Sequence, residues 1–345
     1  MSPARTGLRR PLGTATAAAL ATVLATGLAA CGSSSSTASP SPAAASGGST
    51  QVVVAQNTGA PFAETSIAVA RQDAIRAKLP KTLLDGGELR IGVGALPSGF
   101  PPLAFVGTDQ KTLTGAEPDL GRLVAAVLGL KPVLSNSTWE NLFVGFDSGR
   151  TDVGFSNITD TEKRKEKYDF ASYRQDNLGF EVNAASTWNF DGKYENLAGQ
   201  KVSVSRGTNQ EKILLEWKAK LEAAGKTLTI LYYPDNNGVH LALTSGKIDT
   251  YFGPNPGIAY HVAQVKGTPS ATRSAGTWSG AGATLQGLIA ATTKKGGGLV
   301  QPVADALNYL IANGQYAQWL KAYNLENEAV KTSEVNPPGL PLTNA

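Results

Sequence analysis

Short apolar segments alternate with longer helical segments along this chain, and the alternation occurs in two successive runs. The first run starts near residue 88 and the second near residue 200. Strands that alternate with helices are typical of parallel α/β sheets. Two such runs predict an α/β fold of two lobes, with a ligand cleft at the carboxyl ends of the strands.

The periodicity of apolar residues gives the expected range of each element. Strands are expected at residues 89–93, 131–134, 152–156, 178–182, 200–204, 227–232, 248–252 and 285–292. Helices are expected at residues 66–79, 119–128, 139–149, 161–166, 210–224, 238–245, 256–265, 299–313 and 316–323. A run of valines within residues 51–57 is consistent with an edge strand.

The first thirty residues have the pattern of a secretion signal. Three arginines precede an almost uncharged Ala, Leu and Thr run at 12–27, which is shorter than the ~20 residues of a membrane-spanning helix. Leu28-Ala29-Ala30-Cys31 then resembles a lipobox, and Cys31 is the only cysteine. We expect residues 1–30 to be a lipoprotein signal peptide and Cys31 to carry a lipid anchor at the outer face of the cell membrane. A transmembrane helix with an incidental cysteine is the alternative.

The composition divides the remaining chain into segments. Residues 32–50 are nearly all Ser, Ala, Gly, Pro and Thr, and such a segment cannot bury a core. The expected division is a flexible tether at 31–60, lobe 1 at 61–182, lobe 2 at 183–285, a return to lobe 1 at 286–328 and an irregular tail at 329–345.

The net charge argues against nucleic acid as a partner. Loss of residues 1–30 removes three arginines and no acid, which leaves 28 basic against 27 acidic residues and a net charge of +1 instead of +4. A nearly neutral protein has no broad field for nucleic acid. We therefore expect no nucleic-acid partner, and we expect a monomer.

Six segments carry a resemblance to one family. They are GFPPLAF (99–105), GAEPDL (115–120), WENL with GRTD (139–152), TDTEKR (159–164), KVSV with GTNQE (201–211) and NGQY (313–316). In this order and spacing they resemble the extracellular solute-binding proteins of family 3, which serve ABC importers of polar amino acids. The resemblance implies a periplasmic-binding-protein-like fold whose lobes are joined by two crossover strands, with hinges near residues 181–183 and 285–288. It also implies capture of a small polar solute, an amino acid or a similar carboxylate, and delivery to the membrane permease subunits of an ABC importer.

The resemblance also points to ligand-binding residues. It assigns Arg164 to the α-carboxylate of the ligand, and a guanidinium suits that role because it donates two parallel hydrogen bonds. Thr208, Asn209 and Gln210 open a helix with a capping box, and the free N–H groups of such a start also bind anions. The other candidates for the cavity wall are Phe100, Trp139, Ser156, Asn157, Thr159 and Asn255. For each of these residues a surface charge, a plain helix cap, a core side chain or a strand-to-helix turn is the structural alternative.

One position departs from the family pattern. Relatives carry an aspartate for the α-ammonium of the ligand after the third strand of lobe 2, but this chain has Pro254 there. Proline offers neither a charge nor an N–H donor. Either Glu117, Asp235 or another acid replaces the aspartate, or the ligand lacks an α-ammonium and ordinary amino acids such as glutamine, histidine and arginine bind poorly.

Other functions are weighed against solute capture. A ligand sensor that docks on a membrane kinase uses the same kind of trap, and some relatives with this fold are enzymes such as dehydratases. The only two histidines, His240 and His261, lack metal-ligand spacing, and we expect each to lie on the surface of a helix. We therefore expect no catalytic residues, no metal and no cofactor.

Overall fold

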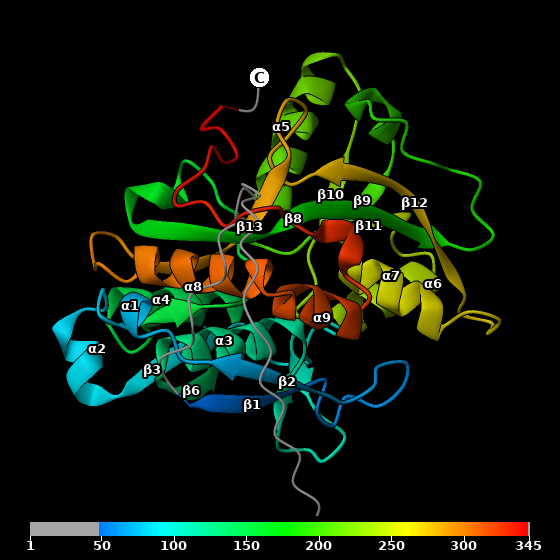
Figure 1. Cartoon of the computed structure of the whole chain (residues 1–345). Coiled ribbons are helices and arrows are strands. Elements are labelled where there is room, and N and C mark those ends of the chain that lie inside the picture. The colour runs from blue at the N-terminus through cyan, green and yellow to red at the C-terminus, as the bar shows by residue number, and fades with distance from the viewer. Residues whose placement is uncertain (1–47, 344–345) are drawn as a thin grey trace, which may run out of the picture. The chain divides into compact units, whose positions relative to one another are not determined.

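One long strand, β8 (Tyr168–Asn183), is shared by both halves of the main sheet (Figure 1). The structure is a computed structural model that describes residues 48–343. The expected signal peptide, the lipidation of Cys31 and most of the tether lie outside the described residues. None of the helices in the described part of the chain is long and apolar enough to cross a membrane.

The first half of β8 belongs to the sheet of lobe 1. There it pairs antiparallel with β13 (Gly287–Lys294), which pairs with β7 (Val153–Gly154). Strand β3 (Glu88–Val93) is parallel to both β7 and β6 (Lys131–Asn136). The first run of alternating segments thus forms a parallel set, as predicted, and a returning antiparallel strand connects it to β8.

Helices cover the two faces of the lobe 1 sheet. Helices α3 (Ala116–Leu128), α8 (Val300–Ala312) and α9 (Gln315–Ala322) pack around one buried core with the side chains of Leu89 and Ile91. Helix α4 (Trp139–Asp147) packs in a separate cluster, where its Leu142 side chain lies directly above Gly92. Because successive residues of a strand face opposite sides, the two helix groups lie on opposite faces.

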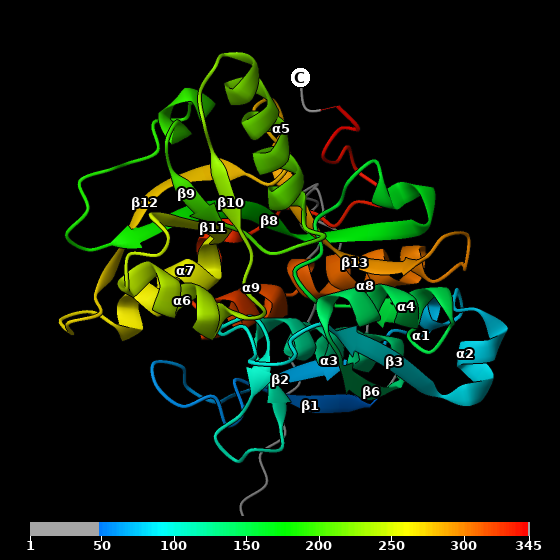
Figure 2. The same ribbon diagram turned by 180° about the vertical axis from the view of Figure 1, so that it is seen from behind.

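The second half of β8 belongs to lobe 2. It pairs antiparallel with β11 (Thr250–Pro254) and β12 (Thr272–Ser279), while β9 (Lys201–Ser203) and β10 (Thr229–Leu231) continue the sheet in parallel. The helices are α5 (Asn209–Ala223), α6 (Asn236–Thr244) and α7 (Asn255–Gln264). In both views α6 and α7 lie side by side (Figures 1 and 2).

The remaining elements are short strands, short helices and 3-10 turns. They are β1 (Ser49–Val54), β2 (Thr65–Ala70), α1 (Asp73–Arg76), α2 (Lys81–Gly86), β4 (Phe105–Val106), β5 (Leu113–Thr114) and the 3-10 turns η1 (Arg164–Glu166), η2 (Tyr194–Leu197) and η3 (Glu326–Glu328). Two expectations are wrong here. The expected helix at 66–79 begins instead as β2, because its alternating Ile67 and Val69 pair with β1 and are buried. The expected tether at 31–60 therefore ends too late, since β1 lies within it.

Three further differences concern boundaries. β12 was not predicted, because its sequence TRSAGTWS shows no clear apolar alternation. The expected division at 182/183 is wrong: β8 leaves β13 at Asp176 and pairs with β12 from Asn177, so the crossover lies there. The tail from 329 has no helix or long strand, as predicted, but it is packed, with Leu340 buried in the lobe 2 core and bridged to Thr161.

Candidate functional site

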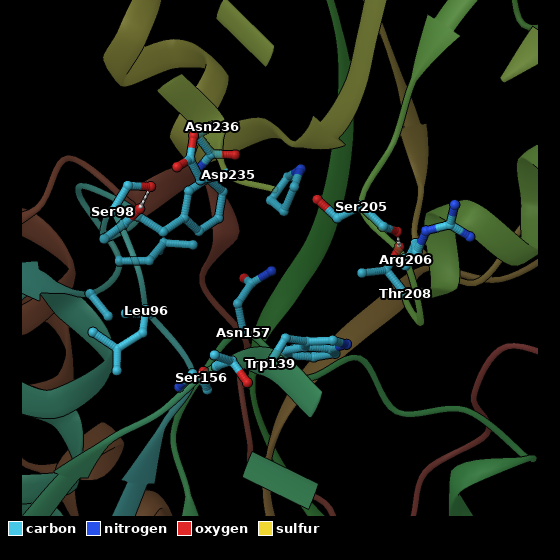
Figure 3. A pocket seen from close by; sticks show the side chains of 18 of the residues that line it. Leu96, Ser98, Trp139, Ser156, Asn157, Ser205, Arg206, Thr208, Asp235 and Asn236 are labelled. Carbon is cyan, nitrogen blue, oxygen red and sulfur yellow. Dashed lines mark hydrogen bonds between the residues drawn. The ribbon is translucent and has the colours of Figure 1, made fainter. Parts of the chain in front are cut away.

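A cavity of about 480 Å³ opens between the two lobes (Figure 3). Its wall contains the loop after β3, the start of α4 and the turn after β7 from lobe 1, and the starts of α5 and α6 and the end of β11 from lobe 2. The lining residues include Phe100, Glu117, Trp139, Glu140, Ser156, Asn157, Arg206, Thr208, Asn209, Gln210, Tyr232, Asp235, Tyr251 and Pro254. The cavity lies where the carboxyl ends of strands meet helix starts, as the alternation predicts.

Lobe 1 contributes aromatic rings and small polar groups. The Ser156 hydroxyl accepts a hydrogen bond from the Gly94 N–H at 2.8 Å, which fixes the turn after β7 against the loop after β3. Asn157 points into the hollow in Figure 3, and its side-chain oxygen accepts from Arg174 at 2.6 Å. The tip of the Phe100 ring lies against Gly257 of α7, leaving no room there for a Cβ, so lobe 1 contacts lobe 2 at this point.

The start of α5 forms the lobe 2 wall. Thr208 is its N-cap, as predicted, but Glu211 reaches back to the Gly207 N–H and not to the Thr208 N–H of the predicted capping box. The Thr208 hydroxyl accepts from the Glu211 N–H at 3.2 Å, and the Glu211 carboxylate accepts from the Gly207 N–H at 2.6 Å. The side-chain amide of Asn209 is buried and donates to Asp176 at 2.9 Å. The first turn of α5 is therefore held rigidly beside the cavity, with the positive end of its dipole there.

Arg164 lies outside the cavity lining, unlike the sequence-based expectation. Its guanidinium donates to the carbonyl of Thr159 at 2.8 Å and to that of Gly207 at 3.3 Å. It also packs 5.3 Å from the centre of the Trp139 ring. Burial lowers the pKa of Arg164 to about 10, so the group remains charged at neutral pH. In this arrangement Arg164 supports Trp139 and joins the lobes at Gly207, and Trp139 also donates to Gly207 at 3.3 Å.

Two other predicted residues do not line the cavity. The Thr159 side chain is buried and donates to Asp176 at 2.7 Å. Asn255 begins α7, and its side-chain amide packs against Gly179 of β8. Phe100, Trp139, Ser156, Asn157, Thr208, Asn209 and Gln210 do line it.

The sequence reasoning missed Arg206, which precedes the capping box. Its guanidinium lies 3.7 Å from the centre of the Tyr232 ring, at the edge of the cavity away from Asn157 in Figure 3. Stacking of this kind holds a guanidinium without neutralising its charge. The signal available in the sequence was an arginine one residue before the glycine of GTNQE.

Both acids that were weighed as replacements for the missing aspartate line the cavity with Pro254. Glu117 is fully buried and accepts hydrogen bonds from Arg174 at 2.7 Å and from the Tyr173 hydroxyl. Burial and the neighbouring Glu117 raise the pKa of Tyr173 well above its usual value, which keeps this hydroxyl a donor. Asp235 caps α6 by accepting from the Gly238 N–H at 2.9 Å. With Glu140, three carboxylates line the cavity against one lining guanidinium, Arg206.

Glu117 is not the only carboxylate that pairs with Arg174. The same guanidinium also pairs with Glu328, which is likewise buried. Burial raises the pKa of Glu328 to about 7 although Arg174 opposes the shift. A pKa near 7 leaves Glu328 partly protonated at neutral pH, so Arg174, Glu117 and Glu328 together are close to neutral. The lining carboxylates outside this group, Asp235 and Glu140, are the ones that favour a cationic group in the solute.

Comparison with characterised proteins agrees with this geometry. Residues 91–326 match the bacterial extracellular solute-binding proteins, family 3. The chain is 31% identical over 164 residues to the L-cystine-binding protein TcyJ of Escherichia coli (strain K12), covering 47% of this chain and 57% of that protein. It is 31% identical over 195 residues to the arginine-binding protein ArgT of Corynebacterium glutamicum (strain ATCC 13032), covering 56% and 62%. The matches thus span less than two thirds of these relatives.

Solved structures show the same fold. An ancestral arginine-binding protein bound to arginine superposes with a TM-score of 0.59 at 24% identity, covering 69% of this chain and 98% of that one. The ancestral amino acid-binding protein AncCDT-1, a precursor of cyclohexadienyl dehydratase, gives 0.58 at 23% identity, covering 70% and 97%. The matched family region is more than half of the 345 residues. This chain belongs to the bacterial extracellular solute-binding proteins, family 3.

Proposed function

We propose that this protein captures an amino acid between its lobes and delivers it to the membrane permease of an ABC importer. The observation that carries the proposal is the arrangement of charge around the cavity. The start of α5, with Arg206 beside it, is suited to an anionic carboxylate, and Asp235 and Glu140 are suited to cationic groups. Such a cavity matches a zwitterion that carries a further cationic group or several amino groups. The similarity to arginine- and cystine-binding proteins supports the same class of solute.

In this proposal Asp235 takes the place of the missing aspartate. Pro254 offers the ammonium no charge. Asp235 lines the same cavity, and among the described residues its carboxylate accepts one hydrogen bond, from the Gly238 N–H. An ammonium in the cavity would otherwise lose its water without gaining a partner. We therefore expect amino acids to bind, with an affinity that depends on Asp235.

The test is a pair of titrations that separates charge from structure. Asp235→Asn removes the charge but keeps a good N-cap for α6. Calorimetry with L-arginine should show about tenfold weaker binding by the variant, a change of ~1.4 kcal/mol. With 5-guanidinopentanoate, which lacks the α-ammonium, wild type and variant should bind alike. L-cystine serves as the second amino-acid probe.

A matched control is Arg150→Ala, which alters an exposed arginine outside the cavity lining and should leave affinity unchanged. Equal binding of L-arginine and L-cystine by wild type and Asp235→Asn would remove Asp235 from the role. Chemical change of the solute during incubation, seen by NMR, would favour an enzyme.

We further propose that Cys31 anchors the mature protein to the membrane by a lipid. The support is the lipobox-like sequence before it and its position as the only cysteine. Labelling of cells with an alkyne fatty acid should mark the wild-type protein and leave Cys31→Ser unmarked. Equal labelling of both would refute the anchor.

A further inference from the structure

Three side chains from distant parts of the sequence meet on lobe 2, away from the lining of the cavity. They are Glu181 of β8, His240 of α6 and His261 of α7, and one ligand atom from each lies within 4.8 Å of the other two. The two imidazole rings are stacked, with centroids 3.5 Å apart and planes 5° from parallel. Two imidazoles and a carboxylate this close together are a possible metal ligand set, for which the parallel rings must turn so that both direct a lone pair at one ion. The spacing of the two histidines in the sequence did not reveal this cluster.

The carboxylate of Glu181 is buried, and only one of its two oxygens has hydrogen-bond partners. Its Oε1 lies 2.5 Å from Nδ1 of His261 and accepts a second hydrogen bond from the Thr272 hydroxyl at 2.5 Å. Its Oε2 has no hydrogen-bond partner, and the nearest candidate, Nε2 of His240, is 3.8 Å away. Leaving a buried carboxylate oxygen unpaired is costly, so a missing partner at this point is expected.

The 2.5 Å contact between Nδ1 of His261 and Oε1 of Glu181 needs a proton between the two atoms, so His261 donates there. A metal ion bound at this nitrogen would displace that proton. The surrounding elements add no further charge to the contacts of the cluster: β12 contributes Thr272 and β11 contributes the edge of the Tyr251 ring, 6.3 Å from His240.

We propose that Glu181, His240 and His261 form a binding site for a divalent transition metal, with Zn²⁺ the best match. Two imidazoles and one carboxylate are a zinc ligand set that leaves a fourth position for water. The cation would give Oε2 its missing partner and would replace the Nδ1 proton between His261 and Glu181. Thr272, which donates to Glu181, would orient that carboxylate from behind. The side chains of His240 and His261 are 23% and 17% exposed, so the site is open to solvent.

The position of the cluster links it to the wall of the cavity. Helix α6 starts at Asp235 and α7 starts after Pro254, and both residues line the cavity. Figures 1 and 2 show these helices next to each other. A metal held by one histidine from each helix would fix their spacing, whichever solute the cavity takes.

The test is a zinc titration of the mature chain without a histidine tag and with Cys31→Ser, so that no tag and no thiol compete. We expect one Zn²⁺ per chain and a rise in melting temperature with zinc. Thr272→Val should weaken zinc binding by about 10- to 100-fold, and His240→Ala, His261→Ala and Glu181→Gln should each weaken it further. Glu64→Gln, an exposed acid of lobe 1, is the control and should bind zinc as wild type does.

A measurement on the protein without these substitutions covers the case in which a variant does not fold. X-ray absorption at the zinc edge should show scattering from two imidazoles. No binding at millimolar zinc, binding as tight as wild type by the variant that carries both His240→Ala and His261→Ala, or a spectrum without imidazole would each overturn the site.

Discussion

At the scale of single residues, Asp160 is the most unusual acid of the TDTEKR segment. It is fully buried, and neither of its carboxylate oxygens has a hydrogen-bond partner. Lys165 Nζ lies 3.4 Å from Oδ1 and forms an ion pair with it. Burial raises the pKa of Asp160 to about 7, and Lys165 offsets only part of that shift. The folded protein therefore prefers Asp160 protonated.

This preference makes stability depend on pH. Because the folded pKa lies above the ordinary value of 3.8, the contribution of Asp160 is complete below about pH 4 and is lost as pH rises through 7. Between pH 5 and pH 8 the free energy of unfolding should fall by on the order of 2–3 kcal/mol from this group. Asp160→Asn should remove that part of the decrease, as measured by urea unfolding at both pH values.

The exposed Asp191 provides the comparison. Asp191→Asn should show the wild-type dependence of the free energy of unfolding on pH. Any contribution of Glu328 to that dependence should be the same in wild type and in both variants. If Asp160→Asn and wild type lose the same stability between pH 5 and pH 8, Asp160 is ionised in the folded protein at both.

The residues of the site show what a sequence can and cannot predict. Trp139, Asn157 and Thr208 were predicted for the wall because they stand at element boundaries within recognisable motifs, and they line the cavity. The position of Arg164 depends on where its long side chain finds carbonyl partners, and these come from Thr159 and from Gly207 of the other lobe. Such contacts depend on how distant segments pack in the folded protein, and a local sequence motif does not reveal this.

At the scale of elements, most helices and strands of the two runs were predicted within a few residues, but β8 begins ten residues before the expected strand at 178–182. The failures at β2 and β12 have one cause. The alternating residues of β2 became a strand because β1 was available as a partner, and β12 is held by β8 although its own pattern is weak. A strand is stabilised by pairing with a neighbour that is distant in sequence, whereas a helix such as α5 carries its own signals.

The cap of α5 is the element-scale feature that joins stability to binding. Thr208→Ala removes the acceptor for the Glu211 N–H and should reduce the free energy of unfolding by about 1 kcal/mol. Because this first turn lines the cavity, amino-acid affinity should fall as well. Thr208→Ser keeps the hydroxyl and should behave as wild type in urea unfolding and in calorimetry. A loss of affinity without any loss of stability would contradict the capping role.

At the scale of the whole molecule, the two lobes already touch at several places in the described chain, one of which is the stacking of Phe62 on Tyr260 of α7. Phe100 lies against Gly257, Trp139 and Arg164 donate to Gly207, and Asn209 donates to Asp176 at the crossover. The lobes share β8, which changes partner between Asp176 and Asn177. We propose that relative motion of the lobes turns near 176–178, a few residues before the expected hinge at 181–183, together with the expected hinge at 285–288. We propose that a solute in the cavity adds to these contacts and holds the lobes together.

The most direct measurement of this claim is thermal unfolding of the protein in the presence of each proteinogenic amino acid, L-cystine and amine-free carboxylates. A solute at 100 times its Kd should stabilise the folded protein by about 2.7 kcal/mol. We expect a saturable rise in melting temperature with one or more amino acids, which is smaller with the amine-free carboxylates and smaller in Asp235→Asn. No rise with any amino acid, or the same rise in wild type and variant, would contradict this claim.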